Sequence, residues 1–200
     1  MIDMAAQTGL PFRALTVDTG RLPDETLAMI EAVRERWGVE VEVVTPDPAE
    51  VAAMVGLHGP DLFHESVEMR QLCCKVRKVR PLERKLREFD AWASGLRRQH
   101  SRTRAEVPKV EFVDGRVKLN PLADWSSAEL DAYVQRRGIP LHPFYSRGYA
   151  SIGCAPCTRA IEPGEDERAG RWWWEEDAKK ECGIHFTPDG KARRTVEHDA

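Results

Sequence analysis

Several features that mark other classes of protein are missing from this sequence of 200 residues. It has no run of about 18 apolar residues, which excludes a transmembrane helix within it. The N-terminus does not place a basic region before an apolar one, so we expect no secretory signal and a cytoplasmic protein. Repeats, low-complexity tracts and domain linkers are also missing, and this length suits one domain with one core.

Cysteine is scarce, and the net charge is small. The chain has five cysteines and a formal charge of −3, which argues against a general nucleic-acid-binding protein. Four of the cysteines form two pairs, Cys73-Cys74 and Cys154-x-x-Cys157. In a reducing compartment such pairs are more often metal ligands or redox groups than structural disulfides.

The spacing of the pairs leaves the metal open. Cys154 and Cys157 form a half-site for zinc or iron, because two intervening residues let both thiolates reach one centre. The side chains of Cys73 and Cys74 diverge unless the backbone there is bent or ends a helix. An iron–sulfur cluster accommodates adjacent ligands better than one tetrahedral zinc does. Cluster and zinc both remain possible at this point, and unrelated cysteines are the third alternative.

Cys182 is the cysteine without a cysteine neighbour. Lys179 and Lys180 precede it, and cationic neighbours favour the thiolate, which is the nucleophilic form. The alternative is an ordinary buried cysteine. His185 could serve Cys182 as a general base or could only pack the tail. Because the segment lies near the C-terminus and contains glycine and proline, we expect it to be mobile.

Basic residues are concentrated between residues 70 and 104, where twelve Lys and Arg face three acidic residues. One interpretation is a solvated helix face, which most charge runs are. The other is an anion site for sulfate or phosphate. The arginines at 97, 98, 102 and 104 favour the second interpretation, because they fall in an expected loop.

The hydrophobic pattern predicts an α/β fold with a parallel sheet, because strand, helix and strand follow one another early in the chain. Asp114-Gly115 between two short apolar runs predicts a hairpin, and Ser126 with Glu129 predicts a capping box. After Gly138 we expect irregular structure. Strands are expected at 14–17, 39–44, 91–94, 110–113 and 117–119, and helices at 2–7, 23–37, 48–57, 65–72, after Pro81 and at 126–137.

Three segments resemble the signatures of assimilatory adenylyl-sulfate (APS) reductases. They are CCKVRKVRPL at 73–82, GCAPCTR at 153–159 and ECGIH at 181–185. VDTGR at 17–21 and WASGLRR at 92–98 resemble the same family, so the similarity covers nearly the whole chain. The sister group, which reduces the 3′-phosphorylated substrate (PAPS), shares the ECGIH ending but lacks both cysteine pairs. The resemblance therefore indicates the APS branch.

The resemblance implies a fold of the adenine-nucleotide α-hydrolase type and a thioredoxin-dependent reduction of APS to sulfite and AMP. The thiolate of Cys182 attacks the sulfate sulfur and becomes an S-sulfocysteine. Thioredoxin, or a glutaredoxin-like reductant, then releases sulfite, in sulfate assimilation toward cysteine. The paired cysteines hold a [4Fe-4S] cluster beside the substrate: Cys73, Cys74, Cys154 and Cys157.

The resemblance also assigns residues to the substrate. Lys78 matches the family's lysine between cluster and substrate, and Arg104, Arg168 and Arg171 match its sulfate- and phosphate-binding arginines. Arginine forks suit this task, because attack on sulfate must offset its negative charge. For each arginine the alternative is a surface salt bridge. Thr19 and Gly20 complete the expected substrate-binding residues, and the tryptophans at 172–174 could stack on adenine or only pack.

We expect one domain over residues 1–200, with an α/β nucleotide-binding core at 1–150 and a cysteine-rich part with the catalytic tail at 151–200. The family's phosphate-binding loop before the first helix does not occur here, so we expect the core to be truncated at its N-terminus. We expect no nucleic-acid or membrane partner, and the sequence leaves a homo-oligomer open. The alternatives are a PAPS reductase, a non-catalytic Fe–S or zinc module, and a sulfur-transfer enzyme acting on tRNA.

Overall fold

A parallel pair of strands begins the fold. The structure, a computed structural model, describes residues 1–101 and 104–176. Strand β1 (Ala14–Val17) pairs in parallel with β2 (Val41–Val44), and α2 (Asp24–Trp37) connects them. This is the predicted strand–helix–strand unit. The loop after β1 therefore opens at the carboxyl edge of a parallel sheet, where such folds bind ligands.

A second sheet contains the predicted hairpin. Strand β3 (Ala91–Ala93) pairs in parallel with β5 (Arg116–Leu119), which pairs antiparallel with β4 (Val110–Val113). Asp114 and Gly115 both have positive φ, at 49° and 76°, as a two-residue hairpin turn requires.

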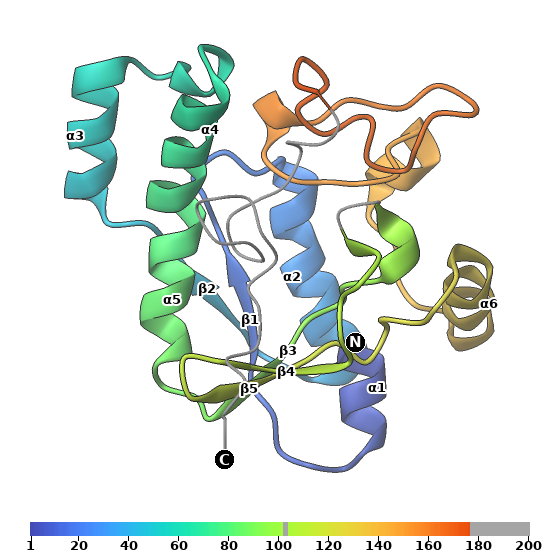
Figure 1. Cartoon of the computed structure of the whole chain (residues 1–200). Helices are drawn as coiled ribbons and strands as arrows, with labels where there is room; N and C mark the ends of the chain where they lie inside the picture. The colour runs from blue at the N-terminus through green and yellow to red at the C-terminus, as the bar shows by residue number, and fades with distance from the viewer. Residues whose placement is uncertain (102–103, 177–200) are drawn as a thin grey trace.

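Helices flank the strands on both sides. Figure 1 shows α4 and α5 following one another along one side of β1, with α2 on the other side. Within the described residues, no helix is long and apolar enough to cross a membrane. Besides α2, the α-helices are α1 (Ile2–Gln7), α3 (Pro48–His58), α4 (Val67–Cys74), α5 (Arg80–Leu86) and α6 (Ser127–Arg137).

Helices α4 and α5 are joined by a π-helical segment, Lys75–Val79, that the sequence pattern did not predict. Pro81 gives the physical reason. Its ring has no N–H and clashes with the carbonyl of an ordinary α-helical turn, and a wider turn relieves both problems. Cys73 and Cys74 are the last two residues of α4, and the backbone changes from α-helix to π-helix directly after them. Such a helix end or bend is expected from the sequence if both side chains are to reach one centre.

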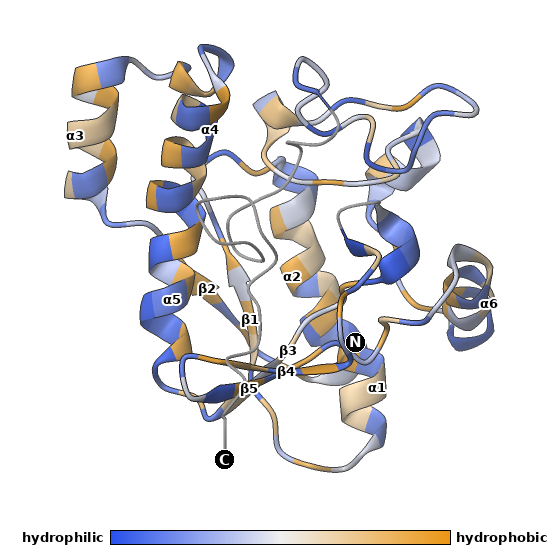
Figure 2. Ribbon diagram, viewed as in Figure 1, coloured by the Kyte–Doolittle hydropathy of each residue, from blue (hydrophilic) through white to orange (hydrophobic). Residues whose placement is uncertain are grey.

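The main apolar core surrounds the cysteines rather than the second sheet. Its members come from α3, the 3₁₀ turn Leu62–His64, α4, the π-helical segment and the C-terminal part of the described chain. Helix α3 carries apolar residues around much of its surface (Figure 2). The buried members are Met54, Leu62, Phe63, Cys73, Val76, Cys157 and Trp172. Both cysteine pairs therefore belong to this apolar core or pack against it.

The second sheet turns its charged face inward. Glu111 and Lys118 are cross-strand partners, both are buried, and their side chains form an ion pair at 2.5 Å. Asn120 donates a further hydrogen bond to Glu111 at 3.0 Å. The opposite face carries Val110 and Phe112, which are 52% and 58% exposed. Alternation alone predicts an apolar face turned inward, so the tertiary structure reverses that expectation.

Buried Asp3 joins three helices. It accepts hydrogen bonds from the Tyr133 hydroxyl at 2.6 Å, from Arg137 Nε at 3.1 Å and from Trp37 Nε1 at 3.1 Å. The hydrogen bond from Arg137 is the largest of the influences that lower the pKa of Asp3 far below its usual range. Helix α1 is thereby fixed to α2 and α6.

Asp3→Asn is expected to lower the free energy of unfolding by about 2 kcal/mol at pH 7, because the bonds lose their charged acceptor. The pKa of folded Asp3 lies below the unfolded value of about 3.9. Its contribution is therefore present above that pH and is lost as the pH falls toward the folded pKa. Urea unfolding at pH 7 and pH 3 should show the deficit shrinking. Asp131→Asn on α6, an exposed position, is the control, and an Asp3→Asn deficit independent of pH would contradict the assignment.

Candidate active site

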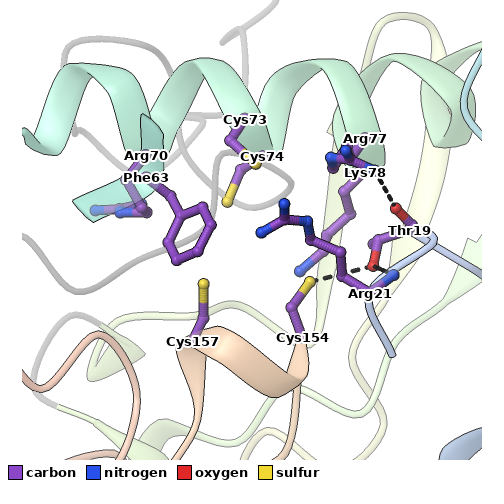
Figure 3. A pocket seen from close by; sticks show the side chains of 10 residues that line it. All are labelled: Thr19, Arg21, Phe63, Arg70, Cys73, Cys74, Arg77, Lys78, Cys154 and Cys157. Carbon is purple, nitrogen blue, oxygen red and sulfur yellow. Dashed lines mark hydrogen bonds between the residues drawn. The ribbon is translucent and has the colours of Figure 1, made fainter. Parts of the chain in front are cut away.

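Both cysteine pairs lie on the wall of one cavity. Cys73 and Cys74 come from the end of α4, and Cys154 and Cys157 come from the short 3₁₀ turn near the C-terminal end of the described chain. Figure 3 shows thiols of the two pairs facing one another across the cavity. The structure thus brings together all four predicted ligands. The other lining residues are Thr19, Arg21, Phe63, Arg70, Arg77 and Lys78.

Burial disfavours the thiolate forms of Cys157 and Cys73. Burial, together with the neighbouring Cys154, raises the pKa of Cys157 to about 12. Burial also raises the pKa of Cys73, which nearby Arg77 and Arg21 partly oppose. The thiolate forms of Cys73 and Cys157 are therefore favoured by added positive charge. A bound metal centre provides such charge, and metal binding deprotonates its cysteine ligands.

The donor set fits a thiolate-bound metal group. Four sulfur ligands suit zinc or an iron–sulfur cluster, whereas magnesium and calcium prefer oxygen. Among the described residues, no three His, Cys, Asp or Glu side chains are grouped closely enough to hold a metal ion. The thiols therefore surround a cavity and do not converge on one point.

The loop after β1 packs against the second cysteine pair. Thr19 is fully buried, and its Oγ1 lies 3.2 Å from Cys154 Sγ. Arg77 Nη1 donates to the Thr19 carbonyl at 2.9 Å, which ties the loop to the π-helical segment. Gly20 has a φ of +69°, a conformation that favours glycine, and its N–H donates to Asp18 Oδ1 at 2.8 Å. Thr19 thus adjoins the cysteines, whereas Gly20 is not among the residues that line their cavity.

Four cationic side chains contribute to the cavity wall: Arg21, Arg70, Arg77 and Lys78. Lys78 lies there as predicted, whereas Arg21 and Arg77 were not singled out from the sequence. A signal existed for Arg77. It follows Cys73 by four residues, as Lys78 follows Cys74, and residues four apart share a helix face. Arg21 reaches the cavity from the loop after β1, and its signal was the VDTGR segment at 17–21, of which only Thr19 and Gly20 were assigned to the substrate.

Arg171 braces the cysteine segment from behind. Its guanidinium donates to the carbonyls of Ile152 at 3.1 Å and Cys157 at 3.3 Å. A Cβ at Gly153 would lie 2.2 Å from the Arg171 side chain, which explains the glycine before the second pair. Arg171 is buried and is not among the residues that line the cavity.

The other two predicted arginines are also buried outside the cavity lining. Arg168 Nη1 lies 3.5 Å from Ser151 Oγ. Arg104 Nη1 lies 3.4 Å from His100 Nδ1. Because both side chains are buried, neither arginine fits the alternative of an exposed surface salt bridge. Their assignment to substrate, with that of Arg171, stays a prediction.

Trp172 is buried among arginines. The guanidinium carbons of Arg70, Arg171 and Arg168 lie 4.5, 4.7 and 5.8 Å from its ring centroid. Trp174 packs against the His64 ring with centroids 4.2 Å apart. Both tryptophans therefore pack within the protein.

In the arginine-rich loop, Arg97 and Arg98 form ion pairs within the protein, and Arg102 is not described. Arg97 pairs with Glu167 at 3.0 Å, and Arg98 pairs with Asp124. These two arginines have structural partners. Arg102 lies outside the described residues, as do Cys182 and His185.

Comparison with known proteins identifies relatives along nearly the whole chain. The family model described as "Phosphoadenosine phosphosulfate reductase domain" matches residues 1–160. An "Adenosine 5'-phosphosulfate reductase" of Allochromatium vinosum is 50% identical over 95% of this chain and 77% of its own length. The protein of that name from Burkholderia cepacia is 51% identical over 90% of this chain and 72% of its own.

Solved structures support the fold. A phosphoadenylyl-sulfate reductase from Candida auris has a TM-score of 0.64 at 24% identity, over 80% of this chain and 76% of that one. A Candida glabrata FMN adenylyltransferase has a TM-score of 0.53 at 15% identity, over 76% of this chain and 45% of that one. These likenesses confirm the predicted adenine-nucleotide α-hydrolase type of α/β fold. The chain belongs to the phosphoadenosine phosphosulfate reductase domain family, in the branch whose curated members are named adenosine 5′-phosphosulfate reductases.

Proposed function

We propose that this protein reduces APS to sulfite and AMP, in sulfate assimilation toward cysteine. The observation that carries the proposal is the single cavity lined by both cysteine pairs and Lys78. The pairs are the feature by which the sequence resembles the APS branch, and relatives about 50% identical carry that name.

The first step is attack of the Cys182 thiolate on the sulfate sulfur of APS. A bond forms between Cys182 Sγ and the sulfur, and the bond from that sulfur to the bridging oxygen breaks. AMP leaves with the electron pair, and the enzyme carries an S-sulfocysteine. Positive groups beside the substrate offset the charge that attacker and sulfate bring together.

The second step needs a dithiol reductant, for which we propose thioredoxin or a glutaredoxin-like protein. One reductant thiolate attacks Cys182 Sγ and displaces sulfite, which leaves with the sulfur–sulfur bonding pair. The second reductant thiol resolves the mixed disulfide and restores Cys182. The two electrons thus come from the reductant, which becomes a disulfide.

We infer that the four cavity cysteines hold a [4Fe-4S] cluster: Cys73, Cys74, Cys154 and Cys157. Thiols that surround a cavity without meeting at a point favour a group of several metal ions over a single zinc. When bound, the iron ions of the cluster would stabilise the four cysteines as thiolates. Lys78, Arg21 and Arg77 add fixed charge on the same wall.

Substrate preference separates this proposal from the PAPS alternative. We expect kcat/KM for APS to exceed that for PAPS by at least about tenfold, a difference of about 1.4 kcal/mol in transition-state binding. The measurement is sulfite release from each substrate with one reductant. A preference for PAPS would assign the protein to the sister activity.

Label transfer separates an enzyme from a non-catalytic metal module. Protein mixed with ³⁵S-labelled APS and no reductant should become labelled, and the dithiol should release that label as sulfite. A module that only binds metal takes up no covalent label. We further propose a cytoplasmic location, since reduced thiols and a cluster both require a reducing compartment.

A further inference from the structure

The two cysteine pairs come from parts of the chain that lie 80 residues apart, counted from Cys74 to Cys154. A metal group bound by all four thiolates requires the pairs at one defined separation, because metal–sulfur distances vary little. The loop after β1 lies between the pairs. Figure 3 shows the Arg21 side chain extending from this loop into the space between them, and Arg21 is one of the residues that line the cavity.

The main chain of this loop is bound to the second pair. Ala155, which lies between the two cysteines of that pair, donates its N–H to the Arg21 carbonyl at 2.8 Å. Thr19 Oγ1 lies 3.2 Å from Cys154 Sγ, and it also accepts a hydrogen bond from the Arg21 N–H at 3.3 Å. The position of the Arg21 main chain is therefore fixed relative to the second pair.

The side chain of Arg21 contacts the connection between α3 and α4. Its Nη2 donates to the Pro60 carbonyl at 2.5 Å, and its Nη1 pairs with Asp61 Oδ1 at 3.2 Å. Its guanidinium carbon lies 5.0 Å from the centroid of the Phe63 ring. Phe63 is buried and belongs to the same apolar core cluster as Cys73. The side chain thus binds the segment that leads into the first pair.

One residue therefore connects the two sides of the cavity. The 3₁₀ turn Leu62–His64 packs against α4, and α4 ends in the first pair. The side chain of Arg21 holds this side of the cavity, while its carbonyl holds the other. A guanidinium suits the task, because its planar donors have fixed directions and can bind several acceptors at once. Lysine at this position would supply the same charge without the two directed bonds.

A simple surface salt bridge does not account for these contacts. The Asp61 side chain is 69% exposed, and an ion pair with so exposed a partner contributes little to stability. The hydrogen bond to the Pro60 carbonyl and the contact with the Phe63 ring do not depend on the Asp61 charge. What the contacts share is that they fix where two separate segments lie.

We propose that Arg21 is a positioning residue that holds the two cysteine pairs at the separation which the metal group requires. This inference rests on the proposed function, because the metal group is the [4Fe-4S] cluster inferred there. Arg21 is not itself a ligand. It acts on the second pair through its carbonyl and on the first pair through its guanidinium. Without these contacts the four ligands remain present but are held less firmly, so iron is released faster.

The test measures the rate at which anaerobically purified, iron-loaded protein releases iron to an excess of a coloured chelator. Arg21→Met keeps a long side chain without donors and should release iron at least about tenfold faster than wild type, as expected when a group that orients metal ligands is lost. Arg21→Lys keeps the charge and should be nearly as fast as Arg21→Met. Amide hydrogen exchange over residues 60–64 and 154–158 should accelerate in both variants.

Two further variants serve as controls. Arg34→Met removes an exposed arginine that pairs with Glu31 on α2, and it should release iron at the wild-type rate. Asp61→Asn removes only the exposed ionic partner of Arg21. It should accelerate release by less than about threefold, because the Pro60 bond and the Phe63 contact remain.

The outcomes separate this role from the proposed reaction. Iron release at the wild-type rate in Arg21→Met or in Arg21→Lys would overturn the positioning role and leave APS reduction intact. If Arg21→Met does not fold, the rate in Arg21→Lys decides the question. Wild-type protein purified without iron would refute the cluster, and the role of Arg21 with it. Wild-type protein that keeps its iron but forms no adduct with APS would refute the reaction, whatever the release rates are.

Discussion

Cys182→Ser is expected to abolish sulfite release from APS, with a loss of at least about 1,000-fold, while APS binding and iron content stay at wild-type levels. A serine hydroxyl ionises far less readily than a thiol, and sulfur is the better nucleophile. An S-sulfocysteine also cannot form on oxygen, so the reductant has no sulfur–sulfur bond to attack. Wild-type protein incubated with APS and no reductant should gain one sulfite-sized group on the peptide containing Cys182.

The control for this experiment is the reductant itself. Adding reduced thioredoxin should remove the added mass from the wild-type peptide and release one equivalent of sulfite. The proposed chemistry would be refuted by an adduct on Cys73 or Cys157, or by sulfite production in Cys182→Ser at the wild-type rate. Cys182→Ser also tests whether Cys182 is separate from the four proposed cluster ligands, because the variant should then keep its iron.

Serine at any one of the four cavity cysteines is expected to remove most of the iron, the brown colour and the activity together. Cys157 should be the most sensitive position. It is buried, and its pKa is raised to about 12, so its ionised form depends strongly on a bound positive group. Cys74 is less buried than Cys73. Cys74→Ser is thus the most demanding test of the ligand set.

The measurements are iron content and the visible spectrum of anaerobically purified protein. Cys182→Ser serves as the matched control, since it removes one thiol outside the pairs. Full iron content in Cys74→Ser would refute the assignment of that ligand. If the wild-type protein is colourless and contains one equivalent of zinc, the site binds zinc and the cluster assignment is wrong.

Local sequence determined most of the secondary structure. The capping box at Ser126 and Glu129, the positive-φ turn at Asp114-Gly115 and the helix end at Gly38 all occur as predicted. Such signals depend on hydrogen bonds and backbone preferences within a few residues. The cysteine spacings and the resemblance to APS reductases also predicted six residues that the structure brings to one cavity, and their roles there stay predictions. They are the four paired cysteines, Thr19 and Lys78.

The roles of charged residues were decided only by tertiary structure. Arg70 and Glu175 become partners across 105 residues, and nothing near either residue in sequence indicates the other. Arg171, predicted from the resemblance to bind substrate, also braces the backbone at Ile152 and Cys157. A charged side chain takes its role from the groups that surround it after folding, because burial and partners set its energy.

The second sheet shows the same limit for hydrophobic pattern. The two short apolar runs that flank Asp114-Gly115 correctly predicted strands β4 and β5. The pattern could not predict that Glu111 and Lys118 face inward while Val110 and Phe112 face outward. Period-two alternation fixes which residues share a face. Which face is buried depends on the elements that pack against the sheet, and those lie far away in the sequence.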